Sequence, residues 1–364
     1  MITATLFAQD ATPADPDKTA RPPAPLKTGK KDRYVIFPVV VKSPEYRWGA
    51  GAAGTFFFKI GKDSTARTSS FKAVTFVTLR KQLVAATEGN IYFPNEKYII
   101  YVVSSATKFP DKFWGLGNTT VNSELENYKI EQFSIFPKLM RRVYSSVYAG
   151  VGYEFQHVWR FDYDRSGNSI FDQEQIVGRN GGWVSGPGVT VTWDNRNHAF
   201  APSKGFYLQF YVGVYRQAVG SDFNFAVRNL DVRKYIALSK KVVLAFQANL
   251  ISTSGDVPIR QLTNIGSNSY MRGYYEGRYT DKNLLAFQSE LRFPLYKRFS
   301  MVTFAGVGRV GSSLKEVFIP EHLKPSIGAG LRFALSPSEK LHLRVDAGFG
   351  NRSNGTYLNM GEAF

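Results

Sequence analysis

The sequence predicts an all-β protein, a single transmembrane antiparallel β-barrel of about 16 strands. From Tyr34 to the last residue, segments of about ten residues alternate apolar with polar side chains, which is the period of a β-strand. The polar faces carry small and hydrogen-bonding residues instead of the Lys and Glu that coat soluble sheets, as a polar lumen requires. Aromatic residues gather near the expected strand ends, where the membrane interfaces lie: Tyr98, Phe113, Trp114, Trp159, Trp193 and Tyr207.

The alternation is clearest in four segments. Along 206–215, Phe, Leu, Phe, Val and Val occupy one face, and Tyr, Gln, Tyr, Gly and Tyr occupy the other. The segments 244–250, 285–293 and 341–349 repeat this pattern. Counting from a first strand at 34–41 to a last strand at 355–364 gives roughly 16 strands, an even number, as bacterial single-chain barrels have. Closure is expected because an open edge in lipid leaves backbone groups without hydrogen bonds.

The chain divides into three parts. Residues 1–8 read MITATLFA, and we expect them to be the remnant of a secretory signal peptide. Residues 9–33 are rich in Pro, Ala, Asp and Lys, so we expect a flexible periplasmic tail. We expect residues 34–364 to form the transmembrane barrel. With the tail in the periplasm, the loops after odd-numbered strands are extracellular and long, which fits 161–181 and 252–282. The second is long enough to predict a functional loop.

The composition excludes several classes of protein. The chain has no cysteine and four histidines, which leaves no thiolate nucleophile, no disulfide framework and no cysteine-ligated metal site. It has no uninterrupted apolar stretch of about 18 residues, so a helical membrane protein is excluded. The net charge is +17, but the basic residues are spread along the chain without a nucleic-acid-binding module. We therefore expect attraction to an anionic membrane surface and no binding of nucleic acid.

Two short motifs match known binding patterns in letters but not in context. Residues 49–54 spell G-x-G-x-x-G, yet they run on into a strand instead of a helix. Residues 162–167 begin like a calcium loop, yet Gln173 stands where the bidentate Glu belongs. Arg344 and Asp346 share one strand face and are interpreted as an ion pair in the lumen. No nucleophile, base and orienting group occur together, so we expect no enzyme activity, no cofactor and no metal.

The long loop carries the most specific motif of the chain, formed by Met271, Arg272, Gly273 and Tyr274. Glu290, on the polar face of the strand that follows, can accept a charge-assisted hydrogen bond from Arg272. This region resembles the BamA/TamA superfamily of outer-membrane insertases and secretion pores, also called the bacterial surface-antigen family. The resemblance implies that the tip of the loop folds back into the lumen, where Arg272 pairs with acidic groups on the wall such as Glu290.

Two further segments resemble the same family. Segment 194–205 resembles its periplasmic turn, D-x-R-[N/D] followed by P-x-x-G, through Asp194, Arg196, Pro202 and Gly205. The terminal Gly-Glu-Ala-Phe, which ends at Phe364, resembles the terminal strand signal by which such barrels are themselves assembled. The resemblance therefore covers essentially everything after the tail.

The chain departs from the family at two points. Family members commonly carry F-x-D-x-G on the thirteenth strand, which supplies a second carboxylate for the loop arginine, but here Gly306 occupies that position. The loop is then held by Glu290 alone or with help from Asp346. Typical members also carry POTRA domains before the barrel, and the tail leaves room for none, so the chain resembles the short, barrel-only branch. A periplasmic or membrane protein partner would replace these domains.

The resemblance also implies a function at the junction of the first and last strands, which we call the seam. It includes Tyr34, Pro38, Gly355 and Phe364, and a short or weakly paired seam would offer a free edge to nascent strands. We expect insertion, assembly or translocation of outer-membrane or surface proteins by a monomeric barrel among outer-membrane lipid and lipopolysaccharide. Two alternatives remain open, a secretion pore for a dedicated cargo and a non-transporting accessory subunit of a larger complex.

Overall fold

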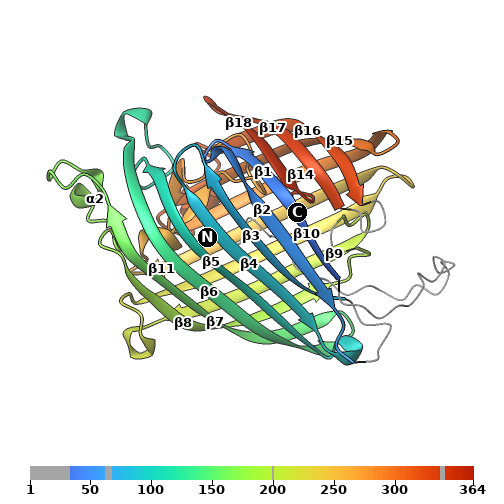
Figure 1. Cartoon of the computed structure of the whole chain (residues 1–364). Coiled ribbons are helices and arrows are strands. Elements are labelled where there is room, and N and C mark those ends of the chain that lie inside the picture. The colour runs from blue at the N-terminus through green and yellow to red at the C-terminus, as the bar shows by residue number, and fades with distance from the viewer. Residues whose placement is uncertain (1–32, 62–67, 199–200, 337–340) are drawn as a thin grey trace.

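The computed structural model describes residues 33–61, 68–198, 201–336 and 341–364. Within these ranges, sixteen strands form one closed antiparallel barrel (Figure 1). The barrel follows the chain from β1 to β11, continues from β14 to β18 and closes between β18 and β1. This confirms the predicted fold class and the predicted number of strands. The expected signal remnant, 1–8, and the tail up to residue 32 lie outside the described residues.

The strands are long, and short helical turns occur only between them in the described ranges. The barrel strands are β1 (Arg33–Ser43), β2 (Arg47–Phe58), β3 (Ser69–Thr78), β4 (Leu83–Tyr92), β5 (Tyr98–Phe113), β6 (Glu126–Tyr144), β7 (Val147–Asp162), β8 (Gly182–Asp194), β9 (Gly205–Tyr215), β10 (Phe225–Ala237), β11 (Val243–Gly255), β14 (Asn283–Tyr296), β15 (Phe299–Gly311), β16 (Lys324–Ser336), β17 (Leu341–Gly350) and β18 (Ser353–Met360). The helical turns are η1 (Pro94–Glu96), η2 (Asn122–Glu124), α2 (Ile170–Gln173), η3 (Gln217–Val219), η4 (Ile259–Gln261) and η5 (Glu316–Phe318). The short strands β12 (Thr263–Ile265) and β13 (Tyr279–Asp281) form a separate two-stranded sheet.

On the barrel strands the polar faces are buried and the apolar faces are exposed, which is the reverse of the arrangement in a soluble protein. Along β14, the side chains of Gln288 and Glu290 are buried, whereas Phe287, directly before Gln288, is 46% exposed. Along β8, Val189 and Val191 are exposed and Thr190 between them is buried. The polar sets therefore face the lumen and the apolar sets face outward, which is the arrangement that a barrel adopts in lipid. No helix in the described part of the chain is long and apolar enough to cross a membrane.

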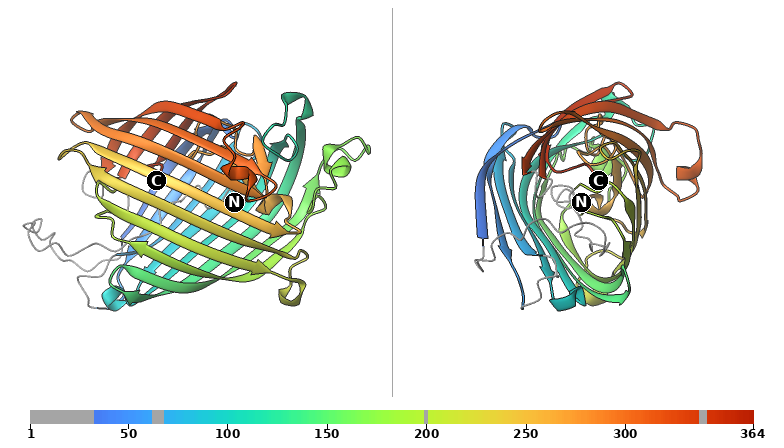
Figure 2. Two further views of the ribbon diagram at one scale, coloured as in Figure 1. Left: turned by 180° about the vertical axis from the view of Figure 1, so that it is seen from behind. Right: turned by 90° about the vertical axis from the view of Figure 1, so that its right-hand side faces the viewer.

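The two ends of the barrel differ in their connections (Figure 2). The long segments 114–125, 163–181, 256–282 and 312–323 all follow strands that run in the same direction, so they gather at one end. The opposite end carries turns as short as 145–146. Because outer-membrane barrels have short periplasmic turns and longer extracellular loops, the end with the long segments is extracellular, in agreement with the expected orientation.

Three of the six aromatic residues expected at the membrane interfaces point inward instead. Phe113, Trp114 and Tyr207 are buried, because Phe113 and Tyr207 belong to the lumen-facing sets of β5 and β9 and Trp114 packs on Tyr275 of the long loop. The expectation was wrong for these three. The remaining three side chains lie on the outside of the barrel: Tyr98, Trp159 and Trp193.

The last strand also ends earlier than predicted. β18 stops at Met360, and Gly361, with a φ of +83°, turns the chain away from the sheet. Phe364 is buried beside Tyr235 of β10, and its backbone oxygen accepts a hydrogen bond from Arg292 Nη2 at 2.8 Å. The prediction that Phe364 belongs to the last strand and to the seam was therefore wrong.

Candidate functional site: the lumen loop and the seam

The segment 256–282, which we call the lumen loop, lies against the inner faces of the barrel strands. It contains η4 and the β12–β13 sheet, and it is seen inside the barrel in the end-on view of Figure 2. At its tip, Met271, Arg272 and Tyr274 are buried. Gly273 has a φ of +113°, and a Cβ there would lie 2.7 Å from the backbone of Phe349 on β17. Only glycine therefore fits between the tip and the wall.

Arg272 contacts four neighbouring strands. Its Nη2 lies 2.5 Å from Glu290 Oε1 on β14, and its Nη1 lies 2.6 Å from Asp346 Oδ2 on β17. Its Cζ lies 3.6 Å from the ring centroid of Phe304 on β15, and its backbone oxygen accepts a hydrogen bond from the hydroxyl of Ser326 on β16. The side chains of Arg272 and both carboxylates are fully buried, so each charge depends on the others for compensation.

These contacts belong to a larger ring of alternating charges. Arg292 lies 2.8 Å from Glu290, and Arg332 lies 3.0 Å from Glu362 and 2.5 Å from Asp346. A longer contact of 3.9 Å between Arg292 and Glu362 closes the ring. In order, its members are Arg272, Glu290, Arg292, Glu362, Arg332 and Asp346. The ring thus links the tip of the lumen loop to the C-terminal residues 361–364, and Arg344 adds a contact of 3.5 Å to Asp346.

Gly306 makes room for the tip of the loop. A Cβ on Gly306 would lie 3.1 Å from the oxygen of Phe287 and 3.4 Å from Met271 Sδ, and a Cβ on Gly308 would lie 3.3 Å from the same sulfur. The two glycines therefore form the surface on which Met271 rests. The sequence left open whether Arg272 is held by Glu290 alone or also by Asp346. In the structure, Asp346 supplies the second carboxylate.

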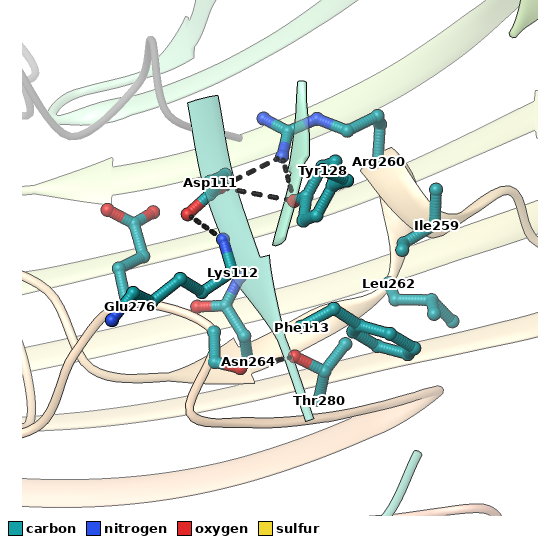
Figure 3. A pocket seen from close by; sticks show the side chains of 11 residues that line it. Asp111, Lys112, Phe113, Tyr128, Ile259, Arg260, Leu262, Asn264, Glu276 and Thr280 are labelled. Atoms are coloured by element: carbon teal, nitrogen blue, oxygen red, sulfur yellow. Dashed lines mark hydrogen bonds and ion pairs between the residues drawn. The ribbon is translucent and has the colours of Figure 1, made fainter. Parts of the chain in front are cut away.

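The lumen loop is also tied to the opposite wall. Gln261 Nε2 donates to Glu154 Oε1 on β7 at 2.9 Å, and the Tyr275 hydroxyl donates to Asp111 Oδ1 on β5 at 3.0 Å. A small pocket lies between the loop and strands β5 and β6 (Figure 3), where Arg260 Nη1 is 3.9 Å from Asp111 Oδ2 and 3.4 Å from the hydroxyl of Tyr128. With contacts on both walls, the loop crosses the lumen and occupies it.

The seam is the weakest junction of the barrel. β1 and β18 share a single registered pair, Lys42 with Leu358, whereas β1 and β2 share eleven pairs and β17 and β18 share eight. Extended from this pair, the antiparallel register would place Met360, the last residue of β18, opposite Val40. Residues 33–39 of β1 therefore have no partner on β18. Tyr34 and Pro38 lie on this stretch, and Gly355 lies beside Pro44, whose Cγ would be 2.8 Å from a Cβ on the glycine.

The lumen loop spans the extracellular part of the seam from inside. The backbone N–H of Gly273 donates to the hydroxyl of Tyr357 on β18 at 2.9 Å, and that hydroxyl donates to the oxygen of Tyr274 at 3.1 Å. Three residues after Gly273, the N–H of Glu276 donates to Glu45 Oε1, in the β1–β2 turn, at 2.7 Å. Burial raises the pKa of Glu276 to about 8, with a further contribution from the negative charge of Glu45.

The predicted turn motif lies at the periplasmic end. Asp194 and Arg196 form a buried ion pair of 3.0 Å, and the guanidinium of Arg196 lies 4.5 Å from the ring centroid of Tyr207. Gly205 has a φ of +110°, and a Cβ there would lie 2.5 Å from the oxygen of Asn195. Pro202 is buried within the turn. The motif therefore closes the β8–β9 connection through contacts that a different residue at 196 or 205 would break.

A closed sixteen-stranded barrel with apolar outer faces and a polar lumen defines a bacterial outer-membrane β-barrel protein. The family described as the Omp85 superfamily domain matches residues 88–364, which is more than half of the chain. The chain belongs to the Omp85 superfamily. No curated protein matches it at the level of sequence.

Solved structures share the fold at low sequence identity. BamA from Haemophilus ducreyi, in a form lacking POTRA domains 1–3, is similar with a TM-score of 0.58 and 12% identity over 91% of this chain and 70% of that one. CdiB from Escherichia coli gives a TM-score of 0.61 and 9% identity over 90% of this chain, and CdiB from Acinetobacter baumannii gives 0.57 and 12% over 90%. The chain spans 62% and 59% of the length of these two CdiB chains.

Proposed function

We propose that this barrel acts in the insertion or assembly of outer-membrane proteins, by opening the seam and offering the freed edges of β1 and β18 to client strands. The observation that carries the proposal is the single registered pair between these strands. Unpaired N–H and C=O groups on a strand edge are a template for another strand, which adds to the sheet through backbone hydrogen bonds.

The position of residues 361–364 supports the proposal. If β18 continued beyond Met360 at its present register, these four residues would stand opposite residues 36–39 of β1. Instead, Gly361 turns them inward, where Glu362 bonds to Arg332 and Phe364 packs on Tyr235. The inward turn leaves this part of the β1 edge available.

A reversible crosslink tests the proposal. Because the chain has no cysteine, a pair introduced at Lys42→Cys and Leu358→Cys forms the only disulfide and joins β1 to β18. The matched control, Ala50→Cys with Val77→Cys, joins β2 to β3 at a pair that is already in register. With the seam variant as the sole copy in its host, we expect the levels of other outer-membrane barrels to fall under oxidising conditions and to recover with reductant. Full barrel levels at complete crosslinking would refute the proposal.

A secretion pore for a dedicated cargo is the second candidate, favoured by the polar side chains that line the lumen faces. The two candidates differ in the part of the barrel that works, since a pore needs the lumen loop to move and needs no open seam. A locked seam that stops barrel assembly favours the insertase, whereas a locked seam with normal export of one cargo favours the pore. Depletion that alters neither barrels nor cargo would identify an accessory subunit.

Within this proposal the barrel works as a monomer among lipid and lipopolysaccharide, and it carries out no catalytic step. Client strands reach the seam through a periplasmic or membrane protein partner. Copurification from crosslinked membranes, with the locked-seam variant as a trap, would recover such a partner and the client together. Recovery of the barrel alone from both the trap and the wild type would contradict this part of the proposal.

A further inference from the structure

A cluster of charged side chains interrupts the apolar outer face of the barrel. Lys108 on β5, Glu131 on β6 and Arg160 on β7 are direct cross-strand partners, and Lys129 lies two residues before Glu131 on the same face. The side chains of Lys108 and Arg160 are 50% and 52% exposed. Three basic groups on adjacent strands thus share one stretch of the outside wall.

The alternation of burial fixes the direction in which these side chains point. Thr107 and Phe109, on either side of Lys108, are buried in the lumen, and so are Ile130 and Gln132 around Glu131. Lys108 and Glu131 therefore belong to the outward sets of their strands. A β-bulge beside Glu131 leaves both Trp159 and Arg160 exposed.

The cluster lies at the level of the lipid headgroups in the outer leaflet. The strands β5, β6 and β7 have 16, 19 and 16 residues, and a strand needs only about 9–11 residues to cross the hydrocarbon core. Counted from the periplasmic end of β5 at Tyr98, Lys108 is therefore near the outer interface. The indole of Trp159 donates to Glu131 Oε2 at 3.3 Å, and His157 stacks on Trp183 at 3.5 Å between centroids. Aromatic side chains of this kind mark the headgroup region.

One carboxylate organises the three cations. Glu131 Oε1 lies 3.6 Å from Lys108 Nζ, 3.2 Å from Lys129 Nζ and 3.7 Å from Arg160 Nη1. Asp162 adds a contact of 2.6 Å to Arg160 Nε. The two lysine ammonium groups and the guanidinium together have more donors than these two carboxylates use, so donors remain for another anion. A phosphate group, with several acceptor oxygens, suits such a set.

We propose that Lys108, Lys129 and Arg160 form a binding site for the phosphorylated headgroup of an outer-leaflet lipid, with Glu131 holding the three cations in position. The bound lipid fixes the depth of this wall in the outer leaflet. The site lies on the outer face of β5, β6 and β7, away from β1 and β18, so it goes beyond the proposed function and does not depend on it.

Lipid binding to the purified full-length chain in a neutral detergent tests the site, with native mass spectrometry as the readout. The probes are diphosphoryl lipid A, the same lipid after dephosphorylation, and inorganic phosphate. The test variant is Lys108→Gln with Lys129→Gln and Arg160→Gln. The control variant, Arg141→Gln with Arg228→Gln and Lys234→Gln, removes three exposed cations from the outward faces of β6 and β10. Heat-modifiable migration establishes that each variant is folded.

We expect the wild type and the control to retain diphosphoryl lipid A and the test variant to bind it at least about tenfold more weakly, since each 1.4 kcal/mol of lost attraction is tenfold. Equal retention by the test variant, or equal binding of the dephosphorylated lipid, would overturn the site. Displacement by millimolar inorganic phosphate would assign it to a free anion and overturn the lipid assignment. If the triple variant fails to fold, Arg160→Gln and Arg160→Lys replace it, with retention expected only for the lysine.

Discussion

The guanidinium of Arg272 lies over the ring of Phe304, with 3.6 Å between its Cζ and the ring centroid. Phe304 belongs to β15 and Arg272 to the lumen loop, so an aromatic face on the wall and two carboxylates from β14 and β17 enclose one cation. Such a contact gains strength when the cation is desolvated, as this one is. The two carboxylates therefore neutralise the charge of Arg272, and the ring of Phe304 helps to fix its position.

Replacing Arg272 with Ala is expected to lower the stability of the folded barrel by about 3–5 kcal/mol, because it leaves two buried carboxylates, Glu290 and Asp346, without their shared partner. The measurement is the temperature at which the compact band is lost in heat-modifiability gels. Strand content by circular dichroism should stay unchanged below that temperature. Arg278→Ala, on the same loop, removes hydrogen bonds to Thr120 and serves as the control. An Arg272→Ala transition at the wild-type temperature would contradict the anchoring role.

Gly205→Ala is expected to destabilise the periplasmic turn by more than about 1 kcal/mol, because the residue has a φ of +110° and its Cβ would lie 2.5 Å from the oxygen of Asn195. Gly167→Ala is the matched control, since Gly167 has a φ of +84° but no atom within 4 Å of its Cβ. Urea denaturation of the refolded barrel measures both. Equal losses would show that backbone conformation alone matters and that the contact with Asn195 does not.

The lumen loop should be held more tightly at low pH. Burial raises the pKa of Glu276 from 4.5 to about 8 and also raises the pKa of Glu45, and the charges of Glu45, Asp111 and Arg260 act on Glu276 as well. A raised pKa means that the folded state binds the proton more strongly than the unfolded state does. The contribution of Glu276 to the free energy of unfolding is therefore complete below about pH 4.5 and is lost as the pH rises through about 8. The unfolding temperature should fall from pH 6 to pH 9, and Glu276→Gln should flatten this dependence. An unaltered slope in that variant would exclude Glu276 as its source.

Glu362→Gln is expected to reduce the free energy that holds residues 361–364 inside the barrel by about 1–3 kcal/mol. The substitution removes the charge that Arg332 contacts at 3.0 Å and Arg292 at 3.9 Å. Ala363 is buried, so a cysteine introduced there reacts slowly with a thiol reagent in the wild-type background. The labelling rate should rise in the Glu362→Gln background. Glu131→Gln, on the outer face, is the control and should leave the rate unchanged.

The sequence predicts local alternation well, and the fold follows from it. A period of two assigns Glu290 and Asp346 to the lumen without reference to any other strand, because neighbouring side chains on a strand point to opposite faces. The contact between Arg272 and Phe304 could not be predicted in this way. It depends on how far each strand is shifted against the next, and alternation within one strand carries no information about that shift.

Two aromatic residues near strand ends lie inside the barrel and not at the membrane interface. Phe364 and Tyr207 are aromatic residues near strand ends, and composition alone favours the membrane interface for both. Phe364 is inside because Gly361 adopts a positive φ and because Arg292, seventy-two residues earlier, binds its backbone oxygen. Tyr207 is inside because it belongs to the lumen-facing set of β9, where the guanidinium of Arg196 lies over its ring. In both cases the guanidinium of an arginine in the lumen lies over the aromatic ring.

The seam is fastened unequally at its two ends. Toward the extracellular side, the lumen loop bonds both to Tyr357 and to Glu45, whereas residues 33–39 toward the periplasm have no partner on β18. Under the proposed function, we therefore expect separation of the two strands to start at the periplasmic end and to stop where the loop holds both sides together. In that mechanism, a client polypeptide from the periplasm would pair first with the stretch of β1 that β18 leaves unpaired, and its first hydrogen bonds would contribute to the free energy of breaking the next ones.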